Sequence, residues 1–219
     1  MAKKRLANNP ANKPAKKGAE EPVVGLRIIG GSLRGRKLEY SGDICTRPMK
    51  DRVREAVFNL LGYGVEGTLV VDLFAGTGAL AIEAISRGAK QAICIERHYP
   101  TAKLIERGAA ELAIADRLSV IFGDAFLWTK SAAPPPAQPL AVFCCPPYDF
   151  YVERNAQMLE LINRWMELSP IGSHLVVEAD ERFDFASLPQ PESWDLRTYP
   201  PAFIGIWEHK AAESQDPEQ

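Results

Sequence analysis

A glycine-rich stretch, VVDLFAGTGALAIEA, contains the residues whose types and spacing are best suited to binding a ligand. Gly76 and Gly78 would let the backbone come close to a ligand, and the helix that follows would offer free N–H groups to a negative group. Asp72, four residues before Gly76, puts a carboxylate at the mouth of this loop. A pyrophosphate would be repelled there, whereas an ammonium group would be attracted. The spacing Gly76-x-Gly78-x-x-Ala81 nevertheless also matches the dinucleotide fingerprint.

Two further carboxylates stand where later strands are expected to end. Glu96 lies 20 residues beyond Gly76 and could accept hydrogen bonds from ribose hydroxyls. Asp124, in GDAF, could accept one from an adenine amine. Taken singly, Asp72 could instead cap a turn and Asp124 could cap the next helix. Taken together, the three carboxylates favour a nucleoside that carries an amino-acid ammonium group, which is S-adenosylmethionine.

The stretch VFCCPPYDF places two adjacent cysteines at the end of an apolar run. They could form part of a metal or redox site, fill the core, or border an active site. The four cysteines form no C-x-x-C pair and the three histidines are not at ligand spacing, so we expect no metal and no disulfide framework. Cys144 is expected to be small apolar filler, whereas residues 145–148 stand at a strand end, where sheets of the expected type bind ligands.

These residues need elements to position them, and from Thr68 onwards the sequence alternates between strand and helix patterns. Strand-like segments are TLVVDLF, QAICIE, LSVIFGD, LAVFCC and SHLVVEAD, and WDLRTYP with AFIGIWEH is expected to form a closing antiparallel pair. The alternation predicts an α/β fold with a mostly parallel seven-stranded sheet covered by helices on both faces. The strand ends at which a ligand would bind are residues 72–78, 96, 123–124 and 145–148.

The N-terminal part is basic, since residues 1–54 carry 14 Lys and Arg against 5 Asp and Glu, while the whole chain has a net charge of −2. VVGLRIIGGSLRGRKLEY predicts a small β-hairpin, and TRPMKDRVREAVFNLLG predicts a helix that opens near Pro48. A basic segment on an acidic body favours an anionic partner, with nucleic acid the leading candidate. No run of about 18 apolar residues and no signal-peptide pattern occurs, so we expect a cytoplasmic protein with reduced thiols.

With DLFAGTGAL, IE, GDA and CPPY in this order, the chain resembles the class I, Rossmann-like methyltransferases that use S-adenosylmethionine. RIIGGSLRGRKL, TRPMKDRVREAVFNLL and DLFAGTGALAIEAISRGA resemble a narrower family, the bacterial methyltransferases that modify a guanine N2 of 16S ribosomal RNA (the RsmD family). The resemblance extends from about Leu26 to Glu208, and TRPMKDRVREAVF is its most specific stretch. It implies a monomer without membrane contact whose partner is 16S ribosomal RNA or a small-subunit assembly particle.

The resemblance also implies a role for each matching residue. The cofactor would be bound by Asp72, Phe74, Ala75, Gly76, Thr77, Gly78, Glu96, Arg97, Asp124 and Ala125. The target-amine pocket would be formed by Cys145, Pro146, Pro147 and Tyr148, with the tyrosine stacking on the base. RNA would be contacted by Arg34, Arg36, Lys37, Arg47, Arg52 and Arg54. The expected divisions are a disordered basic tail (1–23), an RNA-contacting hairpin and helix (24–62), the methyltransferase domain (63–210) and a second disordered tail (211–219).

The chain departs from the family pattern at Cys145, where Asp or Asn normally precedes the two prolines. A guanine amine is a poor nucleophile, and an enzyme gains by accepting hydrogen bonds from it, but a thiol is a weak acceptor. Three accounts stay open. A backbone carbonyl of Cys145 or Pro146 accepts instead, the thiol ionises and accepts as a thiolate, or the protein binds RNA and cofactor but catalyses poorly.

Other functions also stay open. A methyltransferase of another nucleic-acid amine, such as adenine N6 in DNA, would share the same motifs, and only TRPMKDRVRE favours the ribosomal substrate. A catalytically weakened RNA-binding assembly factor is suggested by the basic arm and Cys145. A nicotinamide-dependent oxidoreductase is disfavoured by Asp72 and by the Pro-Pro-Tyr loop.

Overall fold

The computed structural model describes residues 26–40, 48–131 and 137–211. Arg47 and the expected N-terminal tail, 1–23, lie outside these residues, and so does the expected C-terminal tail except for its first residue.

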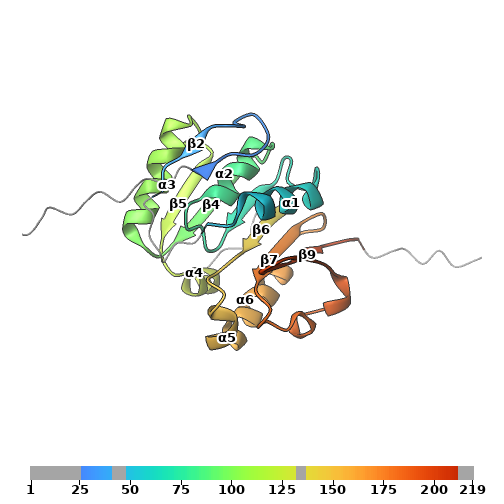
Figure 1. Cartoon of the computed structure of the whole chain (residues 1–219). Helices are drawn as coiled ribbons and strands as arrows, with labels where there is room; N and C mark the ends of the chain where they lie inside the picture. The colour runs from blue at the N-terminus through green and yellow to red at the C-terminus, as the bar shows by residue number, and fades with distance from the viewer. Residues whose placement is uncertain (1–25, 41–47, 132–136, 212–219) are drawn as a thin grey trace, which may run out of the picture.

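A seven-stranded sheet forms the centre of the molecule (Figure 1) and has the order β5-β4-β3-β6-β7-β9-β8. Its strands are β3 (Leu69–Asp72), β4 (Gln91–Glu96), β5 (Leu118–Phe122), β6 (Leu140–Cys144), β7 (His174–Ala179), β8 (Trp194–Tyr199) and β9 (Ala202–Glu208). The first five pair in parallel, whereas β9 runs antiparallel to both β7 and β8. The predicted mostly parallel sheet with its closing antiparallel pair is therefore confirmed.

The strand order places a binding crevice at the centre of the sheet. From β3 the chain adds β4 and β5 on one side, then crosses back to add β6 and β7 on the other. The connections after β3 and β6 therefore leave in opposite directions, which opens a gap at the carboxyl ends of these two strands.

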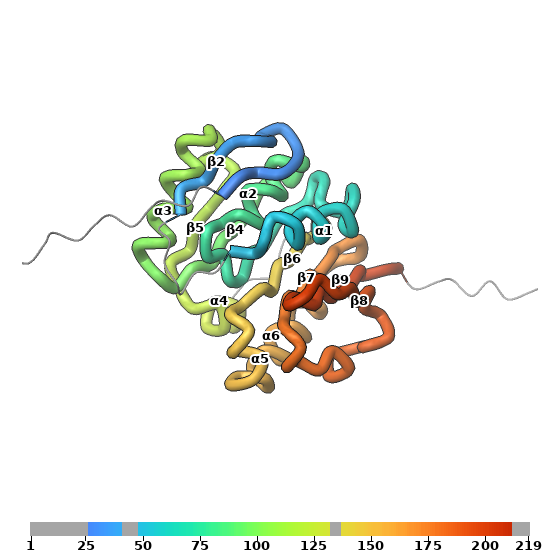
Figure 2. The backbone as a smooth tube through the Cα atoms, viewed as in Figure 1, coloured from blue at the N-terminus to red at the C-terminus, as the bar shows by residue number. Residues whose placement is uncertain are grey.

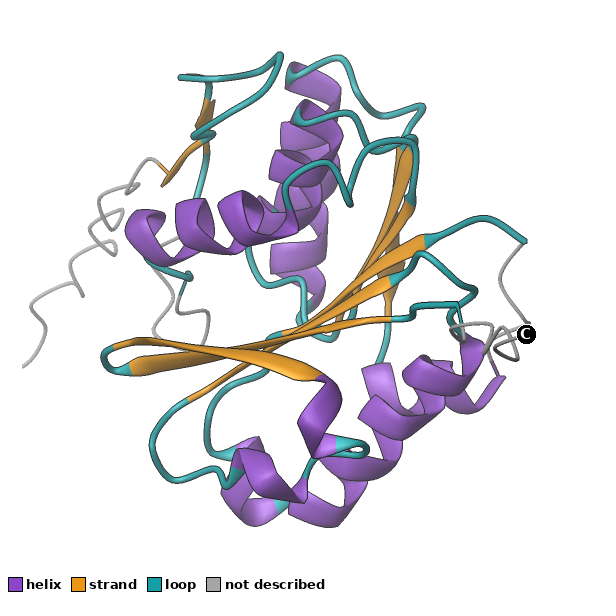
Figure 3. Cartoon of the chain, turned by 90° about the vertical axis from the view of Figure 1, so that its right-hand side faces the viewer, coloured by secondary structure: helices purple, strands orange, loops and turns teal. Residues whose placement is uncertain are grey.

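Helices cover both faces of the sheet (Figure 3). On one face lie α1 (Asp51–Leu61), α2 (Ala79–Ser86) and α3 (Tyr99–Glu111), and on the other lie α4 (Ala125–Ser131), α5 (Phe150–Glu153) and α6 (Asn155–Leu168). Each set of helices encloses its own buried apolar cluster. The 3-10 turns η1 (Phe185–Ser187) and η2 (Pro191–Ser193) lie between β7 and β8. None of the helices in the described ranges has the length and apolar character needed to cross a membrane.

The predicted N-terminal hairpin is present as two short antiparallel strands, β1 (Leu26–Arg27) and β2 (Lys37–Leu38), which lie beside α2 and α3 (Figure 2). The side chain of Glu83 on α2 accepts hydrogen bonds from the backbone N–H groups of Ile29 (2.8 Å) and Gly30 (2.7 Å). Gly31 has φ +73° and passes so close to α2 that a Cβ atom there would lie 1.9 Å from the Ser86 carbonyl oxygen. The hairpin is therefore fixed to the helix that follows the glycine loop.

Candidate active site

Four neighbouring strands end with polar side chains on the same face of the sheet. In β6, Cys144 belongs to the apolar cluster beneath α4–α6, whereas the next residue, Cys145, packs against the cluster beneath α1–α3. This alternation is the ordinary two-residue period of a strand. The same period and the strand register direct Asp72, Glu96 and Glu178 to the face of Cys145. Across β4, β3, β6 and β7 the row therefore reads Glu96, Asp72, Cys145, Glu178.

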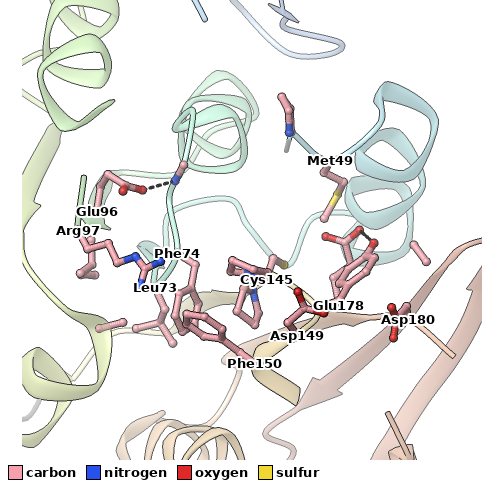
Figure 4. Close-up of a pocket in the computed structure, with 18 of the residues that line it drawn as sticks. Met49, Leu73, Phe74, Glu96, Arg97, Cys145, Asp149, Phe150, Glu178 and Asp180 are labelled. Atoms are coloured by element: carbon pink, nitrogen blue, oxygen red, sulfur yellow. Dashed lines mark hydrogen bonds between the residues drawn. The ribbon is translucent and has the colours of Figure 1, made fainter. Parts of the chain in front are cut away.

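A pocket of about 800 Å³ opens above this row of strand ends (Figure 4). Its wall includes the predicted cofactor residues Phe74, Gly76, Glu96, Arg97, Asp124 and Ala125 and the predicted catalytic residues Cys145, Pro146, Pro147 and Tyr148. The structure thus brings both predicted groups into one cavity. Ala75, Thr77, Gly78 and Asp72 are not part of the wall; Asp72 ends β3, and the other three lie in the loop that follows it.

The glycine loop has the backbone conformation that the sequence required. Gly76 and Gly78 have φ values of 50° and 72°, in the left-handed region that favours glycine. A Cβ atom on Gly78 would also lie 2.9 Å from Ile105 Cγ2. The Gly76 N–H donates to Glu96 Oε2 at 2.9 Å, and the His98 N–H donates to Glu96 Oε1 at 2.7 Å. Glu96 therefore fixes the loop while its carboxylate stays on the pocket wall, where its remaining lone pairs can accept from hydroxyl groups.

Asp72 lies buried beneath the loop with 1% of its surface exposed, and among the described residues neither carboxylate oxygen has a hydrogen-bond partner. Burial raises its pKa to about 7; the nearby backbone N–H groups of Phe74 and Ala81 oppose this shift without forming good hydrogen bonds, and the charge of Glu96 adds to it. A buried carboxylate without a partner is expected to attract a positive group or a water molecule. The ammonium group of S-adenosylmethionine would be such a positive group, with Asp72 placed behind the pocket wall and not on it.

Asp124 caps the start of α4, which is one of the two roles that the sequence allows for it. Its Oδ1 accepts from the N–H groups of Phe126 (2.9 Å) and Leu127 (3.1 Å), at the start of α4. Asp124 also lies on the pocket wall beside Ala125. Capping and ligand contact are therefore compatible for this residue, because the two capping bonds use a single oxygen.

The two cysteines have different environments. Cys144 is fully buried, and burial raises its pKa to about 12, so the prediction of apolar filler is confirmed. At Cys145, burial and the negative charges of Glu178 and Asp72 raise the pKa well above the ordinary value. Burial and these charges disfavour ionisation of the thiol, and with it the account in which Cys145 accepts as a thiolate. Within the residues that the structure describes, no cluster of His, Cys, Asp and Glu could hold a metal ion.

Glu178 is a pocket residue that the sequence analysis missed. It is 8% exposed, and its Oε1 accepts from the Tyr148 hydroxyl at 2.8 Å. Burial raises the pKa of Glu178, and burial together with the charge of Glu178 raises the pKa of the Tyr148 phenol. The signal is present in the sequence, because SHLVVEAD predicts a parallel strand and Glu178 lies near its carboxyl end, where sheets of this type bind ligands.

The predicted RNA contacts divide into two groups. Arg34, Arg36 and Lys37 on the hairpin and Arg52 on α1 are exposed. Arg54 is 1% exposed, and its guanidinium donates to the carbonyl oxygens of Arg27 (2.7 Å) and Met49 (3.3 Å) and to Asp51 Oδ1 (3.0 Å). The prediction that Arg54 contacts RNA is therefore wrong, because its donors hold the hairpin and the start of α1 together inside the protein.

Comparison with known proteins agrees with this geometry. A model of the family described as "Conserved hypothetical protein 95" matches residues 26–199. Ribosomal RNA small subunit methyltransferase D of Haemophilus influenzae is 31% identical over 173 residues, which cover 78% of this chain and 86% of that protein. The solved structure of yhhF from Escherichia coli has a TM-score of 0.68 and 28% identity, and the match covers 86% of this chain and 100% of that one.

A more distant structure shows the fold alone. It is an RNA methyltransferase from Salinibacter ruber in complex with S-adenosyl-L-homocysteine, with a TM-score of 0.54 and 18% identity over 79% of this chain and 100% of that one. The family match and the relatives confirm the resemblance found in the sequence. This chain belongs to the conserved hypothetical protein 95 family, that is, to the RsmD family of methyltransferases, and has the class I methyltransferase fold.

Proposed function

We propose that this protein transfers a methyl group from S-adenosylmethionine to the exocyclic N2 of a guanine in 16S ribosomal RNA. The observation that carries the proposal is the single pocket in which the glycine loop and Glu96 face Pro146, Pro147 and Tyr148. The name of the Haemophilus influenzae relative supports small-subunit ribosomal RNA as the substrate. The choice of guanine N2 rests on the resemblance of the N-terminal motifs to the RsmD family.

The cofactor half of the pocket contributes binding and orientation. When bound, S-adenosylmethionine supplies a methyl group on a positively charged sulfur. The carboxylate of Glu96 would accept hydrogen bonds from the ribose hydroxyls, and the Phe74–Gly78 backbone would hold the methionine end. Asp124 and Ala125 would border the adenine, and Arg97 lies over the Phe150 ring, 5.5 Å from its centroid, on the pocket wall. Much of the rate enhancement in such a displacement comes from positioning the two reacting groups.

The substrate half of the pocket must make the guanine amine more nucleophilic. Its lone pair is delocalised into the ring, and acceptors placed around its hydrogens localise that pair on nitrogen. The carbonyl oxygens of Cys145 and Pro146 are acceptors from the loop, and the two prolines restrict its backbone. The Tyr148 ring, held through its hydroxyl, can replace part of the stacking that the base loses when it leaves its neighbours.

The RNA surface is formed by the exposed basic side chains of the hairpin and α1. These groups neutralise phosphates and supply binding that depends on salt rather than on sequence. The protein acts as a monomer in the cytoplasm, on free 16S RNA or on a small-subunit assembly particle.

A direct test incubates the protein with labelled S-adenosylmethionine and small-subunit particles from a strain that lacks its gene. We expect label at one guanine, located by mapping the modified nucleotide. Incorporation into DNA adenine instead would identify the other nucleic-acid substrate. Measurable cofactor binding without any incorporation would favour the assembly factor.

The hairpin surface can be tested by the double substitution Arg34→Ala and Lys37→Ala. Each lost phosphate contact lowers the slope of log K against log salt by about 0.7–0.9, so we expect weaker RNA binding and a slope smaller by about 1.5. Filter binding of 16S fragments at several salt concentrations measures both quantities. The matched control is Arg164→Ala with Lys130→Ala, which removes two charges from helices of the other face. An equal effect in the control would mean that binding follows net charge and not this surface.

The departure from the family pattern can be tested by Cys145→Asn. An amide oxygen is a better acceptor than a thiol, so this variant is expected to keep or raise the rate of methyl transfer. The rate is measured in single-turnover assays with labelled cofactor, and Cys145→Ala serves as the control that removes the thiol without adding an acceptor. A clear fall in rate for both variants, with unchanged cofactor binding, would make the thiol a specific participant.

A further inference from the structure

Glu178 occupies a place in the pocket that the proposed roles leave unexplained. The strands β6 and β7 pair in parallel with Cys144 opposite Val177, so Cys145 and Glu178 follow as the next pair. Figure 4 shows both residues on the wall of the same pocket, with Glu96 towards its other end. Glu178 is therefore the carboxylate on the strand next to the position where the family pattern has Asp or Asn.

The environment of Glu178 leaves its charge uncompensated. In the described part of the chain it forms no ion pair, and its one side-chain hydrogen bond is accepted from the neutral hydroxyl of Tyr148. Arg182 also lines the pocket, but its guanidinium is bound to Asp149 (2.9 Å) and Asp180 (2.8 Å). A nearly buried carboxylate without a cation destabilises the fold, and such groups in clefts are candidates for function.

The geometry also leaves one oxygen of Glu178 available to a substrate. Oε1 is bound to the Tyr148 hydroxyl, which fixes the orientation of the carboxylate and leaves Oε2 as a free acceptor. At the neighbouring Cys145, burial and the nearby carboxylates disfavour ionisation, and the thiol is a weak acceptor. Burial also makes the carboxylate more basic than usual, because it raises the pKa of Glu178. Of these two neighbouring side chains, Glu178 is therefore the stronger acceptor.

We propose that the Glu178 carboxylate, in place of the side chain before the two prolines, accepts a hydrogen bond from the target amine and then takes its proton. This inference rests on the proposed function. The amine lone pair forms the new N–C bond while the methyl carbon–sulfur bond breaks, and the electron pair of that bond stays on sulfur. The nitrogen then carries one extra proton, which passes to Glu178 and from there to water, so the charge balances.

The first variant is Glu178→Gln, which keeps the size of the side chain. If the amide oxygen stays bound to the Tyr148 hydroxyl, the group facing the amine becomes an NH₂ donor that cannot accept. We expect kcat to fall at least tenfold, in line with the effect of a lost proton acceptor, which is about 10²-fold or more. The KM for RNA and the affinity for S-adenosyl-L-homocysteine, measured by calorimetry, are expected to stay within about twofold.

The second variant restores an acceptor on the neighbouring strand. Cys145→Asp is expected to raise kcat at least threefold when Glu178 is already Gln. In the wild-type background it is expected to give no gain, because two adjacent carboxylates repel and one of them becomes protonated. This dependence on background would not arise if Glu178 only supported the fold. A Cys145→Asp effect that is the same in both backgrounds would overturn the proposal.

Tyr148→Phe tests whether Glu178 accepts from the target amine or only holds Tyr148 in place. It removes the hydrogen bond to Glu178 and keeps the carboxylate, so it is expected to lose clearly less activity than Glu178→Gln. An equal loss in the two variants would mean that Glu178 acts only by holding Tyr148. A wild-type protein that transfers no methyl group to RNA would overturn the proposed function as well. An active wild type with an equally active Glu178→Gln would overturn this inference alone.

Discussion

Replacing Glu96 with alanine is expected to weaken the binding of S-adenosylmethionine by at least ~100-fold. The carboxylate accepts from the Gly76 and His98 N–H groups and lies on the pocket wall, so the substitution removes the proposed ribose acceptors and frees the glycine loop. A hydrogen bond to a charged group contributes about 1.5–3 kcal/mol, and the loss of two such bonds to the ribose corresponds to a factor of ~100 or more. Calorimetric titration with S-adenosylmethionine and S-adenosyl-L-homocysteine measures this loss.

The matched control for Glu96→Ala is Glu106→Ala. Glu106 is an exposed glutamate of α3 whose carboxylate pairs with Lys103 at 2.6 Å, away from the pocket wall. The control is expected to bind both ligands like the wild type, because an exposed ion pair contributes little. If Glu96→Ala also bound within about threefold of the wild type, the ribose would have to be held elsewhere.

Arg54→Ala is expected to lower the free energy of unfolding by about 3 kcal/mol or more. The guanidinium bridges the carbonyl oxygens of Arg27 and Met49 and lies 3.8 Å from the buried carboxylate of Glu83. Alanine leaves these acceptors without a partner and opens a space in the interior. Urea unfolding followed by circular dichroism gives the difference between variant and wild type.

The neighbouring arginine of the same helix provides the comparison. Arg52 is exposed, so Arg52→Ala is expected to change stability by less than about 0.5 kcal/mol. For RNA binding we expect the reverse order. Arg52→Ala weakens binding more than Arg54→Ala does, because Arg52 is exposed to phosphates and Arg54 is buried. Equal destabilisation by the two substitutions would contradict the interior role of Arg54.

The sheet and the cofactor end of the pocket could be predicted because the relevant signals are local. Strand and helix patterns alternate along the sequence, and parallel strands joined by helices must end at one edge, which brings Glu96 and Gly76 together. The two-residue period also separates Cys144 from Cys145 without any knowledge of the fold. These features depend on backbone geometry that is common to all such sheets.

The two misjudged residues depend on contacts between distant segments. Arg54 lies in a basic stretch and is indistinguishable in sequence from its exposed neighbour Arg52. It is buried because the hairpin and α2 close over it. Glu178 meets Tyr148, which is 30 residues away in the chain, only when β6 and β7 pair. The partner that gives each side chain its role cannot be deduced from the local pattern.

Because the hairpin is attached to α2, this helix sets a fixed distance between the cofactor loop and the hairpin. The helix starts beside the cofactor loop and holds the hairpin through Glu83, the fifth of its eight residues. Its eight residues measure about 12 Å along the axis, and one inserted residue would rotate Glu83 by about 100°. On the proposed function, substitutions that alter RNA binding can therefore accumulate on the hairpin, whereas the length of α2 must stay constant to keep the hairpin and the cofactor loop at a fixed spacing.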